Sequence, residues 1–468
     1  MSQPDGLNRR AFLRNAGLTA VVGAVGTSTS LVPGIPGILG GAHASAAPLL
    51  PESPGGKFDF DTIYSRIGTD CTKWDRQIAI YGKDHIAVGM GIADMDFKVA
   101  PVVTQALVER IHHENYGYLT IPASHVESIV NWNKRRYGLE INPSWILHSP
   151  SVHPAILSVL RAFSPPGTKV IVQSPTYNGF YGDITAVGCK AEESPLRLVN
   201  GRYAMDFEDL ERRIDNDTNT IILCNPQNPT GNCWSRDDLM TLGEICTRRR
   251  VVVLADEIHC DFVRKGEKYT PFASLPNEKI VANSVTFKSA SKSFNLAAMK
   301  CAYMFSTNPA YLARIKTVGG HREDINTLGM VAHRAAYNEG AEWLDQLLPY
   351  IDGNLEYVET FVRTNMPLVN VVKPQATYLA WLDMSKVADK IGAKEMAAQA
   401  NKKKAPGAAD VTPETILERY LVEHAKVQMT AGSSYGYGSA GRMRMNCGTS
   451  RKLLELAMTN MASALNKA

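Results

Sequence analysis

Lys292 is the residue of this sequence whose type and position most suggest chemistry. It stands in the segment Ser289-Ala290-Ser291-Lys292-Ser293-Phe294-Asn295-Leu296. Lysine is costly to place beside apolar strands unless it has a role there. Burial disfavours the ammonium form, and a neutral amine is a nucleophile toward aldehydes. Taken alone, Lys292 is better explained as a solvated lysine between serines, since most lysines are exposed. The side chains that would surround it therefore have to distinguish the two interpretations.

Three further side chains each follow a short apolar run and could act together with such an amine. The carboxylate of Asp256 could pair with a protonated pyridine nitrogen and keep that ring an electron sink. The amide of Asn228 could donate to a phenolate oxygen, and Tyr177 could stack on the ring face. Separately, they could be a helix N-cap, a turn residue and a core aromatic. Their common position after apolar runs favours one shared site.

The elements that must position these side chains alternate between β and α patterns. The predicted strands cover 169–173, 220–224, 251–255, 280–283 and 377–382, and the predicted helices cover 236–249 and 340–365. Continuous β-rich apolar runs are typical of strands buried on both faces of a parallel sheet. Ligands bind at the carboxyl ends of the strands in open α/β sheets. The sequence therefore predicts an α/β fold with its site at that edge.

The first 46 residues have the pattern of an export signal. Arg9-Arg10 precede a weakly apolar stretch over 16–41, and Ala42-His43-Ala44-Ser45-Ala46 offers two sites of the A-x-A type. We interpret 1–46 as a cleaved twin-arginine signal peptide and the Pro/Gly-rich 47–57 as a linker. A retained membrane anchor is the alternative, which the prolines and glycines of the stretch disfavour. The mature protein is expected to be periplasmic or secreted, exported in its folded state.

Composition excludes several other classes of partner. The 468 residues carry 50 basic and 46 acidic side chains, a net charge of +4, so nothing indicates binding to nucleic acid. The eight cysteines form no C-x-x-C pair, so we expect no metal site and mostly free, buried thiols. No second apolar run of about 18 residues exists, so no stable membrane insertion is expected.

From residue 58 onward the chain resembles the fold-type I pyridoxal-phosphate enzymes of the class I/II aminotransferases, and within them the MalY/PatB cystathionine β-lyase (C–S lyase) subgroup. The matching segments are Ile92–Phe97, Tyr116–Tyr118, Ser174–Asn178, Asn225–Gly231, Asp256–His259, Ser291–Asn295, Pro374–Asp383 and Arg444–Asn446. The resemblance implies a large domain with a mostly parallel central sheet flanked by helices, plus a smaller α+β domain. It places the small domain at 58–104 and 336–468, and the large cofactor-binding domain at 105–335.

The resemblance also implies how pyridoxal 5′-phosphate is held. Lys292 would form the Schiff base and then act as general base and acid. Asp256 would hold the pyridine nitrogen, Asn228 the phenolate oxygen, and Tyr177 the ring face. His259 stands three residues after Asp256, where typical aminotransferases have tyrosine, and this Asp-Glu-Ile-His form favours the lyase subgroup.

The remaining implied roles concern the phosphate, the substrate and a second subunit. Ser289 and the backbone at Ser151-Val152, which opens a helix, would bind the phosphate, because helix N-termini favour anions. Tyr118 would reach the phosphate of the neighbouring subunit, which implies a homodimer with shared sites. Arg444 would bind the substrate carboxylate through two parallel, bidentate hydrogen bonds from its guanidinium.

Four stretches depart from the family pattern. Pro150-Ser151-Val152-His153 lacks the expected glycine before the valine and has a histidine in place of an apolar residue. Lys300 stands where these lyases usually have an uncharged residue, and would either contact the phosphate or be solvated. The charged loop 321–326 suggests a polar substrate if it lines the substrate channel, unless it is an ordinary surface loop. The Lys/Ala-rich stretch 386–411 is expected to be an exposed insertion.

The favoured reaction is α,β-elimination from an S-substituted L-cysteine-type amino acid, giving pyruvate, ammonia and a thiol. An aminotransferase, which passes the amino group to a 2-oxo acid, is the first alternative, because both reactions begin by removing the α-proton. A non-catalytic binding protein is the second, and the intact Lys292 argues against it.

Overall fold

The structure is a computed structural model that describes residues 58–467. The predicted signal peptide over 1–46 and linker over 47–57 therefore lie outside the described residues. The described residues belong to one compact unit, so the expected domain limits at 104/105 and 335/336 stay predictions. Among these residues no helix is both long and apolar enough to cross a membrane.

A seven-stranded sheet forms the centre of the fold, in the order β2-β10-β9-β8-β7-β3-β4. Its strands are β2 (Ile146–Ser149), β3 (Lys169–Val172), β4 (Lys190–Glu193), β7 (Thr218–Cys224), β8 (Val252–Asp256), β9 (Ser284–Lys288) and β10 (Ala302–Phe305). β4, β3, β7, β8 and β9 are parallel to one another, and β10 is antiparallel to both β9 and β2. This mixed, mostly parallel sheet confirms the predicted α/β class.

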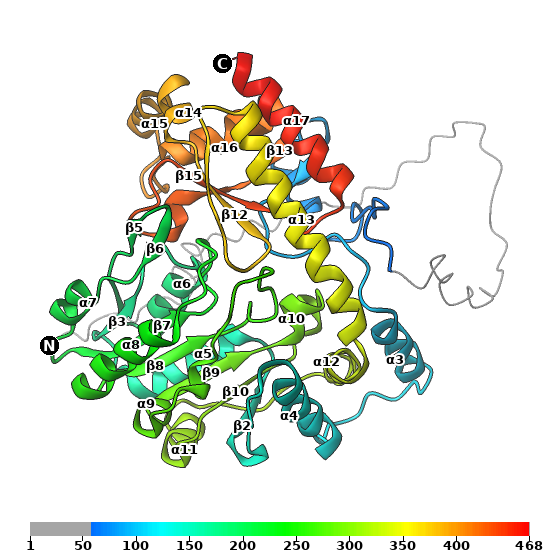
Figure 1. The fold of residues 1–468 in the computed structure, drawn as a ribbon, viewed down its shortest axis with the longest axis vertical. Helices are drawn as coiled ribbons and strands as arrows, with labels where there is room; N and C mark the ends of the chain where they lie inside the picture. The colour runs from blue at the N-terminus through cyan, green and yellow to red at the C-terminus, as the bar shows by residue number, and fades with distance from the viewer. Residues whose placement is uncertain (1–57, 468) are drawn as a thin grey trace, which may run out of the picture. The chain divides into compact units, whose positions relative to one another are not determined.

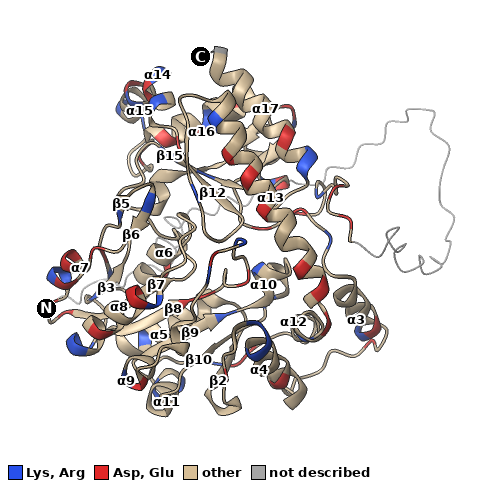
Figure 2. Cartoon of the chain, viewed as in Figure 1, with Lys and Arg blue, Asp and Glu red and all other residues tan. Residues whose placement is uncertain are grey.

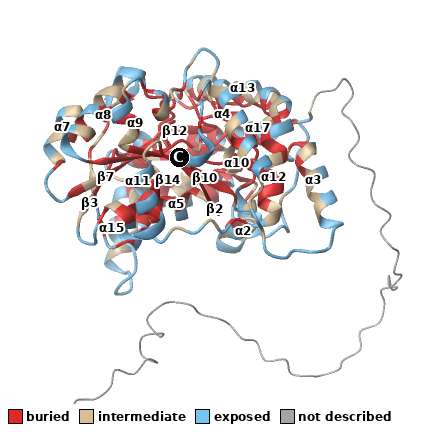
Figure 3. Ribbon diagram, turned by 90° about the horizontal axis from the view of Figure 1, so that it is seen from below, coloured by how far each residue is buried: buried red, intermediate tan, exposed pale blue. Residues whose placement is uncertain are grey.

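Alternate strand residues pack into two separate cores, which explains the uninterrupted apolar runs. In β7, Ile222 faces the core under α5 (Val152–Phe163), α6 (Gly179–Ala186) and α11 (Pro309–Thr317), while Ile221 faces the core under α7 (Phe207–Arg213), α8 (Arg236–Arg249) and α9 (Glu278–Ala282). Figure 3 shows the sheet buried between helices whose outer faces are exposed. Burial on both faces requires apolar residues at every position.

Most predicted elements agree with the structure, but one does not. The helix over 236–249 is confirmed as α8, which begins with a capping box between Ser235 and Asp238. The predicted strand at 280–283 is wrong, because Ile280 and Val281 lie in α9 and the strand begins at Ser284. The side chain of Asn277 caps α9 at Lys279, and a short helix buries these apolar residues against α8 as well as a strand would.

A second, antiparallel sheet has the order β11-β12-β15-β14. Its strands are β11 (Asn370–Val372), β12 (Leu379–Asp383), β15 (Arg442–Asn446) and β14 (Thr430–Ala431). It packs with α13 (Ala341–Asn365), α16 (Pro413–Ala425) and α17 (Arg451–Lys467), seen together at the top of Figure 1. The predicted helix over 340–365 and strand over 377–382 correspond to α13 and β12.

The Lys/Ala-rich stretch is only partly the exposed insertion that its composition predicts. It forms α14 (Ser385–Lys390) and α15 (Ala393–Lys402), and Ala393 and Ala397 are buried against Ile416 of α16. Only residues 402–410 are continuously exposed. The small alanine side chains allow α15 to approach α16 closely.

The remaining elements surround the two sheets. They are α2 (Asp75–Tyr81), α3 (Pro101–Ile111), α4 (Ala123–Tyr137), α10 (Ala290–Ser293), α12 (Thr327–Glu339), the β5 (Arg197–Val199) and β6 (Arg202–Ala204) hairpin, and β1 (Val88–Gly89), which pairs in parallel with β13 (Val427–Gln428). Basic and acidic side chains are mixed on surface helices such as α7 and α17 (Figure 2). The eight cysteines are unpaired, and all but Cys71 are buried, as expected.

Candidate active site

A cavity of about 410 Å³ lies where β7, β8 and β9 end. Ten of the predicted site residues line it: Ser151, Val152, Tyr177, Asn228, Asp256, His259, Ser289, Lys292, Lys300 and Arg444. They come from segments as distant in the sequence as α5 and β15. The structure therefore brings the predicted residues together, with the single exception of Tyr118.

Lys292 lies in the short helix α10, and its amine opens onto the cavity. Its Nζ donates a hydrogen bond of 2.7 Å to the carbonyl oxygen of Ala93. Burial lowers the pKa of Lys292 to about 8, and the nearby Arg444 guanidinium acts in the same direction. The carboxylates of Asp94 and Asp256 oppose this shift. The neutral, nucleophilic form of the amine is thus far more populated near neutral pH than in an ordinary lysine.

Asp256 ends β8 and is buried, with 4% of its surface exposed. Burial raises the pKa of Asp256 to about 6, while a hydrogen bond from the Ile258 N–H and the charges of His153 and Lys292 act against that rise. A buried carboxylate of this kind is stabilised by any cation placed beside it. A protonated pyridine nitrogen is such a cation, and it would lower the pKa of Asp256 again.

His153 explains one departure from the family pattern, although the sequence predicted no role for it. Its Nδ1 lies 2.6 Å from the Asp183 carboxylate and its Nε2 lies 3.3 Å from the Tyr177 hydroxyl. The hydrogen bond to Asp183 raises the pKa of His153. A Cβ on Gly179 would lie 2.6 Å from both the His153 and the Tyr177 rings, so glycine is required there. This arrangement fixes the aromatic ring that flanks the cavity.

The N-terminus of α5 offers an anion site. Ser151 is its N-cap residue, yet no side chain accepts a hydrogen bond from the first turn among the described residues. The first backbone N–H groups are therefore available to an anion, which the helix dipole also favours. The Ser289 hydroxyl donates to the Cys301 carbonyl at 2.8 Å and caps Ser291, so in this structure it positions α10. Lys300 is exposed at the rim of the cavity.

Arg444 enters the cavity from β15 of the second sheet. Its Nη2 donates to the Gly91 carbonyl at 2.6 Å and its Nη1 to Asn228 Oδ1 at 3.2 Å. Its Nε is buried and has no hydrogen-bond partner within residues 58–467. The bond from Arg444 occupies the oxygen of Asn228 and leaves the amide nitrogen free to donate. A carboxylate in the cavity could accept from N–H groups of the guanidinium that these two bonds leave free, the Nε–H among them.

His259 is a neutral ring at the back of the cavity. Only 2% of its surface is exposed, and burial lowers its pKa well below the ordinary value, with the Lys292 and Arg444 charges contributing. Its Nδ1 has no hydrogen-bond partner in the described part of the chain. Thr430, Tyr435 and Cys301 also line the cavity and were missed by the sequence analysis, because no motif marks them.

Two predicted features lie away from the cavity. Tyr118 is fully exposed in the segment between α3 and α4. The loop 321–326 contributes no residue to the lining. Its Glu323 instead accepts hydrogen bonds from the backbone and side chain of His148 in β2, and its His321 Nε2 lies 2.7 Å from the His148 carbonyl oxygen. The expectation that this loop lines the substrate channel is thus not met within this chain, because the side chains of His321 and Glu323 bind β2 instead.

The donor set fits pyridoxal 5′-phosphate. The open first turn of α5 suits its phosphate, the amine of Lys292 its aldehyde, and the amide of Asn228 its phenolate oxygen. The carboxylate of Asp256 suits its ring nitrogen, and Tyr177 its ring face. When bound, this cofactor withdraws electrons from the α-carbon of an amino acid.

The lowered pKa of Lys292 predicts how its reaction with aldehydes depends on pH. Because burial disfavours the ammonium, the neutral amine should be half populated near pH 8, against about 10.4 for an ordinary lysine. The rate at which pyridoxal reacts with the cofactor-free chain should therefore rise with an inflection near pH 8. Subtracting the rate measured with the Lys292→Ala variant isolates the contribution of Lys292 to the reaction with pyridoxal. An inflection near the ordinary lysine value would contradict the assigned environment.

Three comparisons with known proteins bear on the family of this chain. The aminotransferase class I and II family profile matches residues 85–460. Cystathionine beta-lyase PatB of Bacillus subtilis (strain 168) is 36% identical over 413 residues, 87% of this chain and 100% of PatB, and Protein MalY of Escherichia coli (strain K12) is 30% identical over 414 residues, 87% of this chain and 99% of MalY.

A solved structure supports the same grouping. Cystalysin from Treponema denticola, whose crystal structure contains a pyridoxal 5′-phosphate cofactor, superposes with a TM-score of 0.78 at 26% identity, over 88% of this chain and 99% of cystalysin. The family profile spans most of the chain and PatB matches along its whole length. The chain therefore belongs to the aminotransferase class I and II family.

Proposed function

We propose that this protein is a pyridoxal 5′-phosphate-dependent carbon–sulfur β-lyase acting on S-substituted L-cysteine-type amino acids. The observation that carries the proposal is the cavity-facing amine of Lys292, whose pKa burial lowers to about 8, placed among the carboxylate of Asp256, the amide of Asn228 and the guanidinium of Arg444. The relatives named as cystathionine β-lyase, with identity of up to 36%, support the lyase outcome.

Each of these residues has a distinct task in the reaction. The bound cofactor supplies the electron sink for the electrons left at the α-carbon. Arg444 binds the α-carboxylate through N–H groups that its other bonds leave free. Its hydrogen bonds to Gly91 and Asn228 fix the orientation of the guanidinium. Lys292 accepts the α-proton at Nζ, which its lowered pKa allows near neutral pH. Asp256 remains anionic beside the ring nitrogen.

An aminotransferase would need the same residues, and the family profile carries that name. The two reactions differ in their need for a second substrate. We expect pyruvate and a thiol to form from L-cystathionine or an S-alkyl-L-cysteine without any 2-oxo acid, because elimination regenerates the cofactor unaided. Pyruvate and thiol are measured by coupled assays, with Lys292→Ala as the inactive control. Turnover only after addition of a 2-oxo acid would instead identify an aminotransferase.

We also propose a homodimer whose sites are shared, in which Tyr118 of one subunit contacts the phosphate held by the other. The full exposure of Tyr118 in the single chain, away from its own cavity, supports this arrangement.

Mixing two variants tests the shared site. Lys292→Ala and Tyr118→Ala homodimers should both be impaired. After subunit exchange, heterodimers should regain activity, because one of their two sites combines a native Lys292 with a native Tyr118. Activity is followed as pyruvate release before and after exchange. If the mixture merely averages the two homodimers, Tyr118 acts within its own chain or not at all.

Finally, we propose export of the folded holoenzyme, based on Arg9-Arg10 and the segment that follows them. A route that carries folded cargo suits an enzyme that must acquire its cofactor before leaving the cytoplasm. Replacing both arginines by lysine should retain the protein in the cytoplasm, as measured by cell fractionation and immunoblotting. Equal export of the Lys-Lys variant would refute the twin-arginine route.

A further inference from the structure

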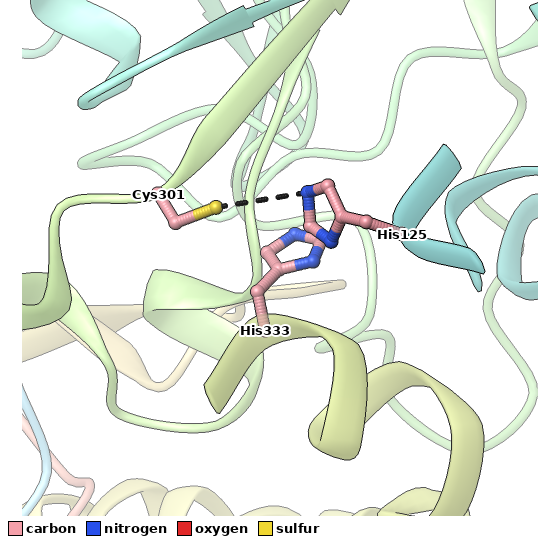
Figure 4. Close-up of side chains that lie close together, drawn as sticks. All are labelled: His125, Cys301 and His333. Atoms are coloured by element: carbon pink, nitrogen blue, oxygen red, sulfur yellow. Dashed lines mark hydrogen bonds between the residues drawn. The ribbon is translucent and has the colours of Figure 1, made fainter. Parts of the chain in front are cut away.

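A second group of potential ligands lies buried beside the cavity. His125 of α4, His333 of α12 and Cys301, which precedes β10, place their ligand atoms within 4.8 Å of one another. Figure 4 shows the two imidazole rings and the sulfur converging, with Cys301 Sγ at 3.9 Å from His125 Nε2. All three residues are at least nine-tenths buried. We call these three residues the His–Cys cluster.

The nitrogens of the cluster lack the partners that buried polar atoms normally have. His333 has no hydrogen-bond partner at either ring nitrogen, and His125 has none at Nδ1, among the described residues. Neutral imidazoles with unshared lone pairs are the form that binds metals.

A fourth group is available from the edge of the central sheet. The rings of His125 and His148 have centroids 5.2 Å apart, and His148 Nε2 is buried without a partner in residues 58–467. Its other nitrogen, Nδ1, lies 3.1 Å from the Glu323 carboxylate. A carboxylate on one nitrogen of a histidine, with the opposite nitrogen free, is the arrangement that orients histidine ligands toward metals.

We propose that the His–Cys cluster, with His148 as fourth ligand, binds a Zn²⁺-class cation. Zn²⁺ prefers tetrahedral sites of thiolate and imidazole, whose ligand atoms lie about 3.3–3.6 Å apart given the usual bond lengths. The separations within the cluster, up to 4.8 Å, are wider than these values, so binding requires the side chains to draw together around the cation. Binding requires the Cys301 thiol to lose its proton to solvent as the bond from sulfur to zinc forms.

The site has an access route and a link to the active site. Cys301 lines the large cavity, which connects the cluster to solvent. The carbonyl of Cys301 accepts the hydrogen bond from the Ser289 hydroxyl, which caps the helix that carries Lys292. A cation on Cys301 would therefore stiffen the segment against which Lys292 is positioned. The cluster itself touches none of the proposed reacting atoms, so its role is structural.

Metal titration of the untagged, chelator-treated holoenzyme tests the proposal. We expect about one equivalent of Zn²⁺ per chain after gel filtration, measured by elemental analysis. Co²⁺ should give a thiolate-to-metal charge-transfer band and visible d–d bands typical of tetrahedral coordination. Cys301→Ser should remove the charge-transfer band, and His333→Phe, which keeps an aromatic ring in the packed site, should abolish stoichiometric binding. Cys246→Ser, which changes a buried cysteine of α8 instead, is the matched control and should bind normally.

Glu323→Gln provides a milder variant, because Glu323 is only half-buried and touches the cluster through His148 alone. We expect its zinc affinity to fall about 10–100-fold. Circular dichroism verifies that each variant is folded. The proposal is overturned if the native chain retains no metal, if bound Co²⁺ shows no thiolate band, or if Cys301→Ser and His333→Phe bind as tightly as Cys246→Ser.

Discussion

The hydrogen bond from the Lys292 amine to the Ala93 carbonyl joins the parts of the fold that build the cavity. Lys292 follows β9 of the central sheet, whereas Ala93 belongs to an N-terminal segment that also contacts the second sheet. An amine held by a carbonyl and enclosed by protein has little water around it, and its pKa falls for that reason. Every proposed chemical step needs this neutral amine, so the position of the segment around Ala93 determines whether the site can act.

That segment is fixed by an unusual concentration of buried polar bonds. Asp96 accepts from the Lys73 ammonium at 2.7 Å and from the Trp74 indole at 3.0 Å, and both charged side chains are almost fully buried. Asn295, three residues after Lys292, bonds both the N–H and the carbonyl of Met95. Removing one member of such a buried pair typically costs about 3–5 kcal/mol. The family motifs around residues 94–96 and 291–295 thus serve largely to fix the position of the Lys292 amine.

Much of the site could be predicted because its residues follow strands. Asp256 and Asn228 come after apolar runs whose carboxyl ends meet at one edge of a parallel sheet, and the resemblance supplied their roles. The run at Ile280 misled the prediction, since a short capped helix and a buried strand look alike in four residues. The contacts of His153 with Asp183 and Tyr177 could not be predicted, and neither could the His–Cys cluster. Both depend on side chains brought together from distant parts of the chain, without a local spacing rule.

The central claim is that one particular amine carries the cofactor. Borohydride reduction of the purified holoenzyme, followed by peptide mapping with mass spectrometry, locates that bond directly. The account predicts a reduced pyridoxyl group on the peptide that contains Lys292, in about one copy per chain, since one cavity holds one cofactor. A label on Lys300 at the rim of the same cavity, or no label at all, would contradict it.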